Sequence, residues 1–136
     1  MRRVRVRVEV PARSFVKRTP EGAVDFRSPL PSWFNYGSVP GTLAADGDPE
    51  DAVVLGPRLA AGTEVEVWAR AVVRFVDAGV PDPKLICSAS PLRPVDRLRV
   101  DLFFRLYARG KRWLNRARGR SGRTAYEGLD PLPEDR

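Results

Sequence analysis

The chain has 136 residues, a net charge of +7 at pH 7, one cysteine and no histidine. This length fits a single domain, and 43% hydrophobic residues are enough for one core. Without histidine there can be no His-based catalytic triad or His-ligated metal, and one cysteine excludes an internal disulfide and a thiolate zinc site. Any metal site must therefore use oxygen ligands, which favours Mg²⁺, Mn²⁺ or Ca²⁺. No apolar run is long enough to cross a bilayer and no secretory signal pattern is present, so we expect a cytoplasmic protein with no membrane partner.

The first part of the chain predicts extended structure. Residues 3–10 alternate valine with charged side chains, which is typical of a half-buried strand, and Pro11 ends it. Two short extended pieces, near 15–18 and 23–26, flank a Pro-Glu-Gly turn and predict a hairpin. Residues 28–51 are rich in proline and glycine, so we expect a long structured loop there.

The second part predicts more strands and then a helix. Strands are expected at 52–55, 64–68, 71–76 and 85–88, and short strands at this spacing suggest a small barrel. Apolar residues at three- to four-residue spacing predict a helix from about Val95 to Ala108, with Pro94 suited to its start and Gly110 to its end. From about Gly119 onward the chain is polar and arginine-rich, and we expect it to be flexible.

Acidic residues form the strongest chemical signal. Asp46, Asp48 and Asp51 lie within six residues, in a turn that contains glycine and proline. Carboxylates this close repel one another, and a divalent metal ion is the simplest cation to neutralise them. A solvated polar turn is an equally common meaning of such a hexapeptide.

A second acidic pair strengthens the metal interpretation. Asp77 and Asp82 lie in the loop between two apolar strands and are followed by Lys84, although these two residues alone are more typical of a plain loop. If the loops meet, five carboxylates share one cavity, and two metal ions there could activate water for phosphoryl chemistry. Basic and phenolic side chains could then bind phosphate oxygens, although each alone is more typical of a surface charge or a core-edge tyrosine: Lys17, Arg27, Tyr36, Lys84 and Tyr107.

Several motifs, in order over about residues 4 to 114, resemble those of soluble (family I) inorganic pyrophosphatases, with this chain a short and divergent member. They are Val8–Pro11, Val16–Lys17, Val24–Arg27, Asn35–Leu43, Asp46–Asp51, the D-x4-D-x-K spacing of Asp77, Asp82 and Lys84, Phe103–Tyr107 as a helix end, and Gly110–Trp113 as a G-K-W strand.

The resemblance implies a mainly β fold, a small OB-like closed barrel of about five strands with one or two helices packed on it. The pyrophosphatase-like barrel domain that it implies spans residues 1–118, and the composition of residues 119–136 predicts an arginine-rich, flexible tail after it.

The same resemblance implies hydrolysis of pyrophosphate to two phosphates by a metal-activated water in a multi-aspartate Mg²⁺ site, with Mn²⁺ as a substitute. Asp48 would orient and deprotonate the water, and Glu9 would lie in the outer shell of the site. The metal ligands would be Asp46, Asp51, Asp77 and Asp82, and the substrate-binding residues Lys17, Arg27, Tyr36, Lys84 and Tyr107. The partners it implies are pyrophosphate and further copies of the chain, as a homo-oligomer such as a hexamer.

Departures from the family pattern keep alternatives open. Thr19 stands where the family usually has an acid, Glu50 where it has an apolar residue and Ala108 where it has a lysine. The chain could therefore be a divergent relative that binds or slowly hydrolyses a nucleotide or polyphosphate. A basic nucleic-acid-binding barrel is a third reading, which we disfavour because the aromatic residues do not alternate with arginines along strands.

Overall fold

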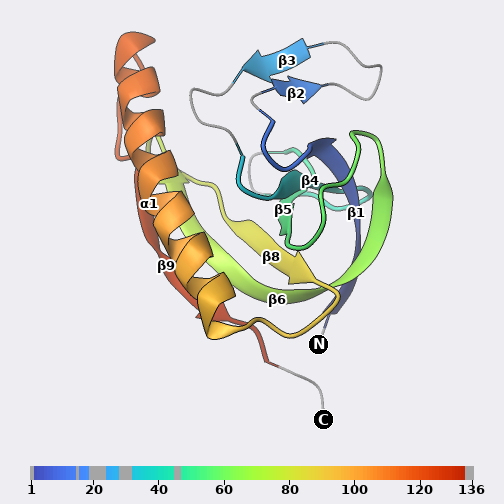
Figure 1. Ribbon diagram of the computed structural model, residues 1–136. Helices are drawn as coiled ribbons and strands as arrows, with labels where there is room; N and C mark the ends of the chain where they lie inside the picture. The colour runs from blue at the N-terminus through green and yellow to red at the C-terminus, as the bar shows by residue number, and fades with distance from the viewer. Residues whose placement is uncertain (1, 15, 19–23, 28–31, 45–46, 134–136) are drawn as a thin grey trace.

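A computed structural model describes residues 2–14, 32–44 and 47–133, together with the backbone of 16–18 and 24–27. Five strands form a closed barrel in the order β1-β4-β5-β8-β6, and pairing between β6 and β1 closes it (Figure 1). The neighbours β5 and β8 are parallel, and the other barrel pairs are antiparallel. The predicted fold class, a mainly β, OB-like barrel of about five strands, is confirmed. The barrel strands are β1 (Arg2–Val10), β4 (Asn35–Val39), β5 (Glu50–Val54), β6 (Glu64–Asp77) and β8 (Lys84–Ser88).

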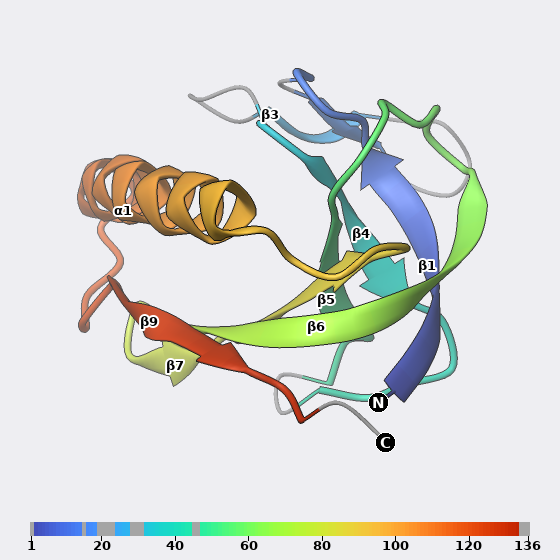
Figure 2. The same cartoon turned by 60° about the horizontal axis from the view of Figure 1, so that its bottom comes forward.

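The remaining elements are added around the barrel. β2 (Val16–Arg18) and β3 (Val24–Arg27) pair as the predicted hairpin. β7 (Val80–Pro81) and β9 (Ala125–Pro131) both pair with the distal half of β6. The one helix of the described chain, α1 (Pro94–Ala117), runs alongside β9 at one side of the barrel (Figure 2).

Two hydrophobic clusters lie on opposite faces of the barrel wall. Successive side chains of a strand point to opposite faces, so Val53 and Ile86 pack toward α1 with Phe103 and Phe104. Their strand neighbours, including Leu85, belong instead to a cluster with residues of β1, β4 and β6. The helix is therefore held on β5, β6 and β8, the three strands that carry Asp51, Asp77 and Lys84.

Before residue 80, the predicted strands differ from the structure in two places. Residues 28–51 were expected to form a loop, but β4 lies within this range and β5 begins at Glu50. The strands expected at 64–68 and 71–76 are one strand, β6, with an irregular register against β8 between Ala69 and Ala71. The change of pattern in the sequence therefore marks a bulge and not a turn.

The helix is longer than expected. It starts at Pro94 as predicted, but it continues through Gly110, so Gly110–Trp113 is helical and not a strand. It ends before Gly119, whose positive φ of 71° is typical of the residue after a helix. No helix among the described residues has the length and apolar character needed to span a membrane.

The arginine-rich segment after residue 118 also differs from expectation. Residues 125–131 form β9, which pairs along β6. A flexible tail beginning at residue 119 does not match this strand.

Candidate active site

Two of the predicted metal ligands converge on one buried lysine. Asp51, near the start of β5, is the register partner of Lys84, the first residue of β8. Asp82 lies two residues before Lys84 in the chain. The Lys84 Nζ atom is 2.7 Å from Asp51 Oδ2 and 2.7 Å from Asp82 Oδ2. The two acidic segments of the sequence therefore meet, through Asp51 and Asp82.

The electrostatics of this group follow from its burial. The Lys84 side chain is only 2% exposed. Burial alone would lower the pKa of Lys84, but Tyr36, Asp51 and Asp82 together raise it well above its ordinary value. Burial would raise the pKa of Asp51, yet the charge of Lys84 and the hydrogen bond that it donates hold this pKa below its ordinary value. Burial also raises the pKa of Asp82, and the negative charge of Asp51 adds to this effect. Together they outweigh Lys84, which lowers the pKa, so the pKa of Asp82 lies above its ordinary value.

Two tyrosines lie beside these carboxylates. Burial raises the pKa of Tyr36 well above its ordinary value, and the Lys84 ammonium is 5.7 Å from the centre of its ring. Burial also raises the pKa of Tyr107 to about 12, and Tyr107 lies near enough to Asp51, Asp77 and Asp82 to be affected by their charges. Both phenols therefore keep their protons near neutral pH and can donate hydrogen bonds.

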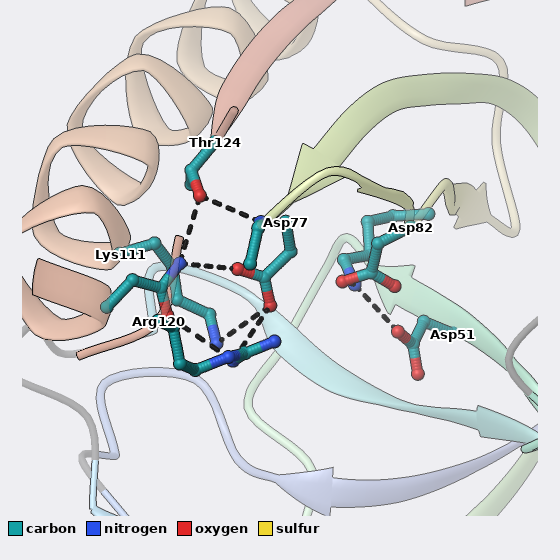
Figure 3. Close-up of polar contacts among 9 residues, drawn as sticks. Asp51, Asp77, Asp82, Lys111, Arg120 and Thr124 are labelled. Atoms are coloured by element: carbon teal, nitrogen blue, oxygen red, sulfur yellow. Dashed lines mark hydrogen bonds and ion pairs between the residues drawn. The ribbon is translucent and has the colours of Figure 1, made fainter. Parts of the chain in front are cut away.

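Asp77 faces other partners (Figure 3). It ends β6, immediately before the tight turn of Ala78 and Gly79, which both have positive φ. Asn115 Nδ2 donates to Asp77 Oδ1 at 2.7 Å. The other oxygen, Oδ2, is 3.4 Å from Lys111 Nζ and 3.7 Å from Arg120 Nη1. Burial would raise the pKa of Asp77, but the hydrogen bond from Asn115 and the two positive charges hold it below its ordinary value.

The other predicted site residues are only partly placed. Asp48 is exposed in the turn before β5, and Glu9 on β1 accepts a 2.7 Å hydrogen bond from Ser38 Oγ. Asp46 lies outside the described residues, as do the side chains of Lys17 on β2 and Arg27 on β3. Of the five carboxylates expected to share one cavity, the structure brings Asp51 and Asp82 together on Lys84, whereas Asp77 has partners of its own and Asp48 is exposed.

The donor set around Asp51 and Asp82 fits a hard divalent cation. Within the described ranges, no three Asp, Glu, His or Cys side chains are arranged to hold a metal ion. Asp51 and Asp82 nevertheless carry two negative charges against the single charge of Lys84. Their oxygens are the ligand type that Mg²⁺ and Mn²⁺ prefer, and the turn that contains Asp48 leads directly into Asp51.

Sequence reasoning missed the partners of Asp77. Lys111 and Asn115 lie four and eight residues after Tyr107, so all three share one face of a helix. The sequence shows this spacing, but a helix that ends at Gly110, as predicted, would not place Lys111 and Asn115 on the same face as Tyr107.

Comparisons with known proteins give a consistent family. A model of the inorganic pyrophosphatase family matches residues 6–108. The inorganic pyrophosphatase of Gluconobacter oxydans is 43% identical over 53 residues, which are 38% of this chain and 31% of that protein. The inorganic pyrophosphatase of Aeropyrum pernix is 36% identical over 75 residues, 54% of this chain and 39% of that protein. The matched segments thus span between about a third and two fifths of these curated relatives.

Structural similarity extends further along the chain. The structure of an inorganic pyrophosphatase from Coxiella burnetii superposes with a TM-score of 0.79 at 25% identity, over 95% of this chain and 86% of that one. Since the family model covers most of the barrel and the first half of α1, the chain belongs to the inorganic pyrophosphatase family.

Proposed function

We propose that this chain hydrolyses inorganic pyrophosphate to two phosphates at the site around Asp51, Asp82 and Lys84. The observation that carries the proposal is the convergence of two carboxylates, from separate segments, on one buried ammonium group. Membership of the inorganic pyrophosphatase family supports this choice of substrate.

The proposed metal ligands are Asp51 and Asp82, together with Asp46, which lies five residues before Asp51 in the sequence. Mg²⁺ is the proposed ion and Mn²⁺ its substitute, because all the ligands are carboxylates. When bound, the ion supplies positive charge against the pyrophosphate oxygens and makes water more acidic. Asp77 is left out of this set because both of its oxygens already have protein partners.

The side chains of the protein would bind the substrate and move one proton. Lys84, Tyr36 and Tyr107 would donate hydrogen bonds to phosphate oxygens, and Lys17 and Arg27 would add positive charge from the β2–β3 hairpin. Asp48 would accept a proton from the attacking water. The water oxygen forms a bond to one phosphorus while the bridging P–O bond breaks, and the departing phosphate takes that electron pair. Glu9 would lie outside the group that touches substrate.

The proposal also includes a cytoplasmic, homo-oligomeric protein, with a hexamer as the form implied by the resemblance. Exposed apolar side chains on α1 support self-association, because Leu98 and Trp113 are each 66% exposed.

The test is phosphate release from pyrophosphate by the purified chain with several millimolar Mg²⁺. We expect EDTA to abolish release and Asp48→Asn to lower kcat by about 100-fold or more, the usual contribution of a general base. Asp130→Asn is the matched control, since it removes an exposed carboxylate on β9. Wild-type protein without turnover in either Mg²⁺ or Mn²⁺ would refute the catalytic proposal.

A substrate panel tests the remaining alternative, a preference for a nucleotide or polyphosphate. Ala108, at the position where the family pattern has a lysine, is buried in the cluster beneath α1 and adds no charge to the site. We expect pyrophosphate to be hydrolysed far faster than nucleoside triphosphates or longer polyphosphate.

A further inference from the structure

The carboxylate of Asp77 is held by three side chains of the C-terminal part of the chain. Asn115 binds one oxygen, while Lys111 and Arg120 contact the other. The Asp77 side chain is 14% exposed, so little of it is left to solvent. All three partners lie beyond residue 108, where the match to the family model ends.

The backbone fixes these partners in place. After α1 ends, Arg120 N donates to Asn115 O at 2.8 Å, which returns Arg120 to the helix. Thr124 Oγ1 accepts hydrogen bonds of 2.9 Å from Ala78 N, next to Asp77, and of 2.9 Å from Asn115 Nδ2. The contact with Asp77 is thus part of a docked interface and not a chance meeting of exposed side chains.

A glycine shows how closely this loop approaches the turn after Asp77. Gly79 N donates to Arg123 O at 2.7 Å. A Cβ atom at Gly122 would lie 2.6 Å from the carbonyl carbon of Ala78. The loop over residues 119–124 therefore packs directly on the turn, and it could not move away without breaking these contacts.

The group of Asp51, Asp82 and Lys84 differs in net charge from the group of Asp77, Lys111 and Arg120. Asp51 and Asp82 share the one cation Lys84, so they keep a negative charge that can attract a divalent ion. Asp77 lies within 4 Å of Lys111 and Arg120, so these three side chains together carry one net positive charge. A divalent ion at Asp77 would be repelled at short range by both Lys111 and Arg120.

We propose that Lys111, with Arg120 and Asn115, takes the place of a metal ion at Asp77, so that this chain binds metal only through the group of Asp51 and Asp82. The inference rests on the proposed metal-dependent function. It also makes the ammonium of Lys111, one helical turn after Tyr107, an additional positive charge for the polyanionic substrate.

Mn²⁺ titration of the full chain by isothermal calorimetry tests the proposal without measuring activity. We expect Asp82→Asn to weaken Mn²⁺ binding at least about tenfold, because a ligand is lost. Asp77→Asn should change the affinity less than about threefold and leave the stoichiometry unchanged, but lower the melting temperature. Equal losses of Mn²⁺ affinity in the two variants would overturn the proposal.

A second variant decides the matter even if Asp77→Asn does not fold. The double variant Lys111→Met, Arg120→Met leaves the Asp77 carboxylate without its cations, so we expect one more Mn²⁺ ion per chain than in wild type. The control is Arg109→Met, Arg116→Met, which removes the same charge from the exposed surface of α1. An unchanged stoichiometry in the first double variant, or an equal rise in both, would overturn the proposal.

The outcomes separate this inference from the proposed function. A wild-type chain that takes up no Mn²⁺ and releases no phosphate would overturn both. Normal Mn²⁺ uptake and phosphate release, together with loss of Mn²⁺ binding in Asp77→Asn, would overturn the inference alone.

Discussion

Three consecutive residues of β4 each make a different contribution to the structure. Asn35 is fully buried and accepts hydrogen bonds from Ala12 N at 3.1 Å and Leu59 N at 2.9 Å, so it joins two loops to the barrel. Tyr36 lies in the candidate site, where the Lys84 ammonium is 5.7 Å from the centre of its ring. At Gly37 a Cβ atom would lie 1.8 Å from the carbonyl oxygen of Arg7 on β1. The pairing of β1 with β4 therefore depends on the absence of a side chain at Gly37, next to the site.

Gly37→Ala should be among the most destabilising single-methyl changes in this chain. We expect a loss of at least about 2 kcal/mol in the free energy of unfolding, because the clash is with backbone and cannot be relieved by a rotamer change. The matched control is Gly41→Ala, where φ is +81° but no atom lies within 4 Å, and where about 1 kcal/mol of backbone strain is expected. Urea unfolding of both variants measures this, and equal losses would contradict the packing argument.

At the scale of elements, the start of α1 follows from local chemistry. Asp96 Oδ2 accepts a 2.8 Å hydrogen bond from Arg93 N, and Pro94 needs no donor of its own at the first helical position. The hydrogen bond from the Arg93 side chain is the main reason why the pKa of Asp96 lies below its ordinary value, and burial opposes this effect. The ionised form of Asp96 is therefore the one that stabilises the helix.

Asp96→Ala should lower the free energy of unfolding by about 0.5–1 kcal/mol at pH 7, the usual value for an acidic residue at a helix start. Because the folded pKa is lowered, this contribution is complete above the unfolded-state pKa and is lost as pH falls through the folded pKa. Denaturant unfolding of wild type and variant from pH 7 to about pH 2 tests this. A difference that persists at the acid end would show that the side chain acts by packing and not by charge.

The sequence predicted elements where a local pattern was sufficient. Alternating valines identified β1, and the hairpin β2–β3 was clear from its turn. β4 was missed because Gly37 is typical of a loop by composition, whereas here it permits close strand contact. The end of α1 was missed because the contacts of Asn115 and Thr124 come from tertiary packing, which composition does not report.

The whole molecule decides which carboxylates form the candidate site. The motifs around Asp51, Asp82 and Lys84 were sufficient to predict that they meet, since β5 and β8 are neighbours. The separation of Asp77 from this group could not be predicted, because it depends on how the segment after residue 118 folds back on β6. Charge distribution in the site is thus a property of the complete fold.

β9 occupies much of the segment that the sequence predicts to be a flexible tail, and removing this strand tests that prediction. β9 pairs with β6 from Ala71 to Val76, and Tyr126 stacks on Phe104 with ring centroids 6.1 Å apart. The Tyr126 hydroxyl also donates to Asp101 Oδ1 on α1 at 2.9 Å.

Ending the chain after Thr124 should therefore uncover Phe104 and the edge of β6. We expect a loss of about 2–4 kcal/mol in the free energy of unfolding, from the apolar area exposed, and a lower melting temperature by circular dichroism. Tyr126→Phe is the control, since it keeps the ring and removes only the hydrogen bond, at about 1 kcal/mol. If the shortened chain melted at the wild-type temperature, β9 would contribute nothing and a flexible tail would be the better description. A loss on the expected scale would mean that β9, which the sequence pattern does not predict, holds α1 on β6. It would thereby keep Lys111 and Asn115 at Asp77.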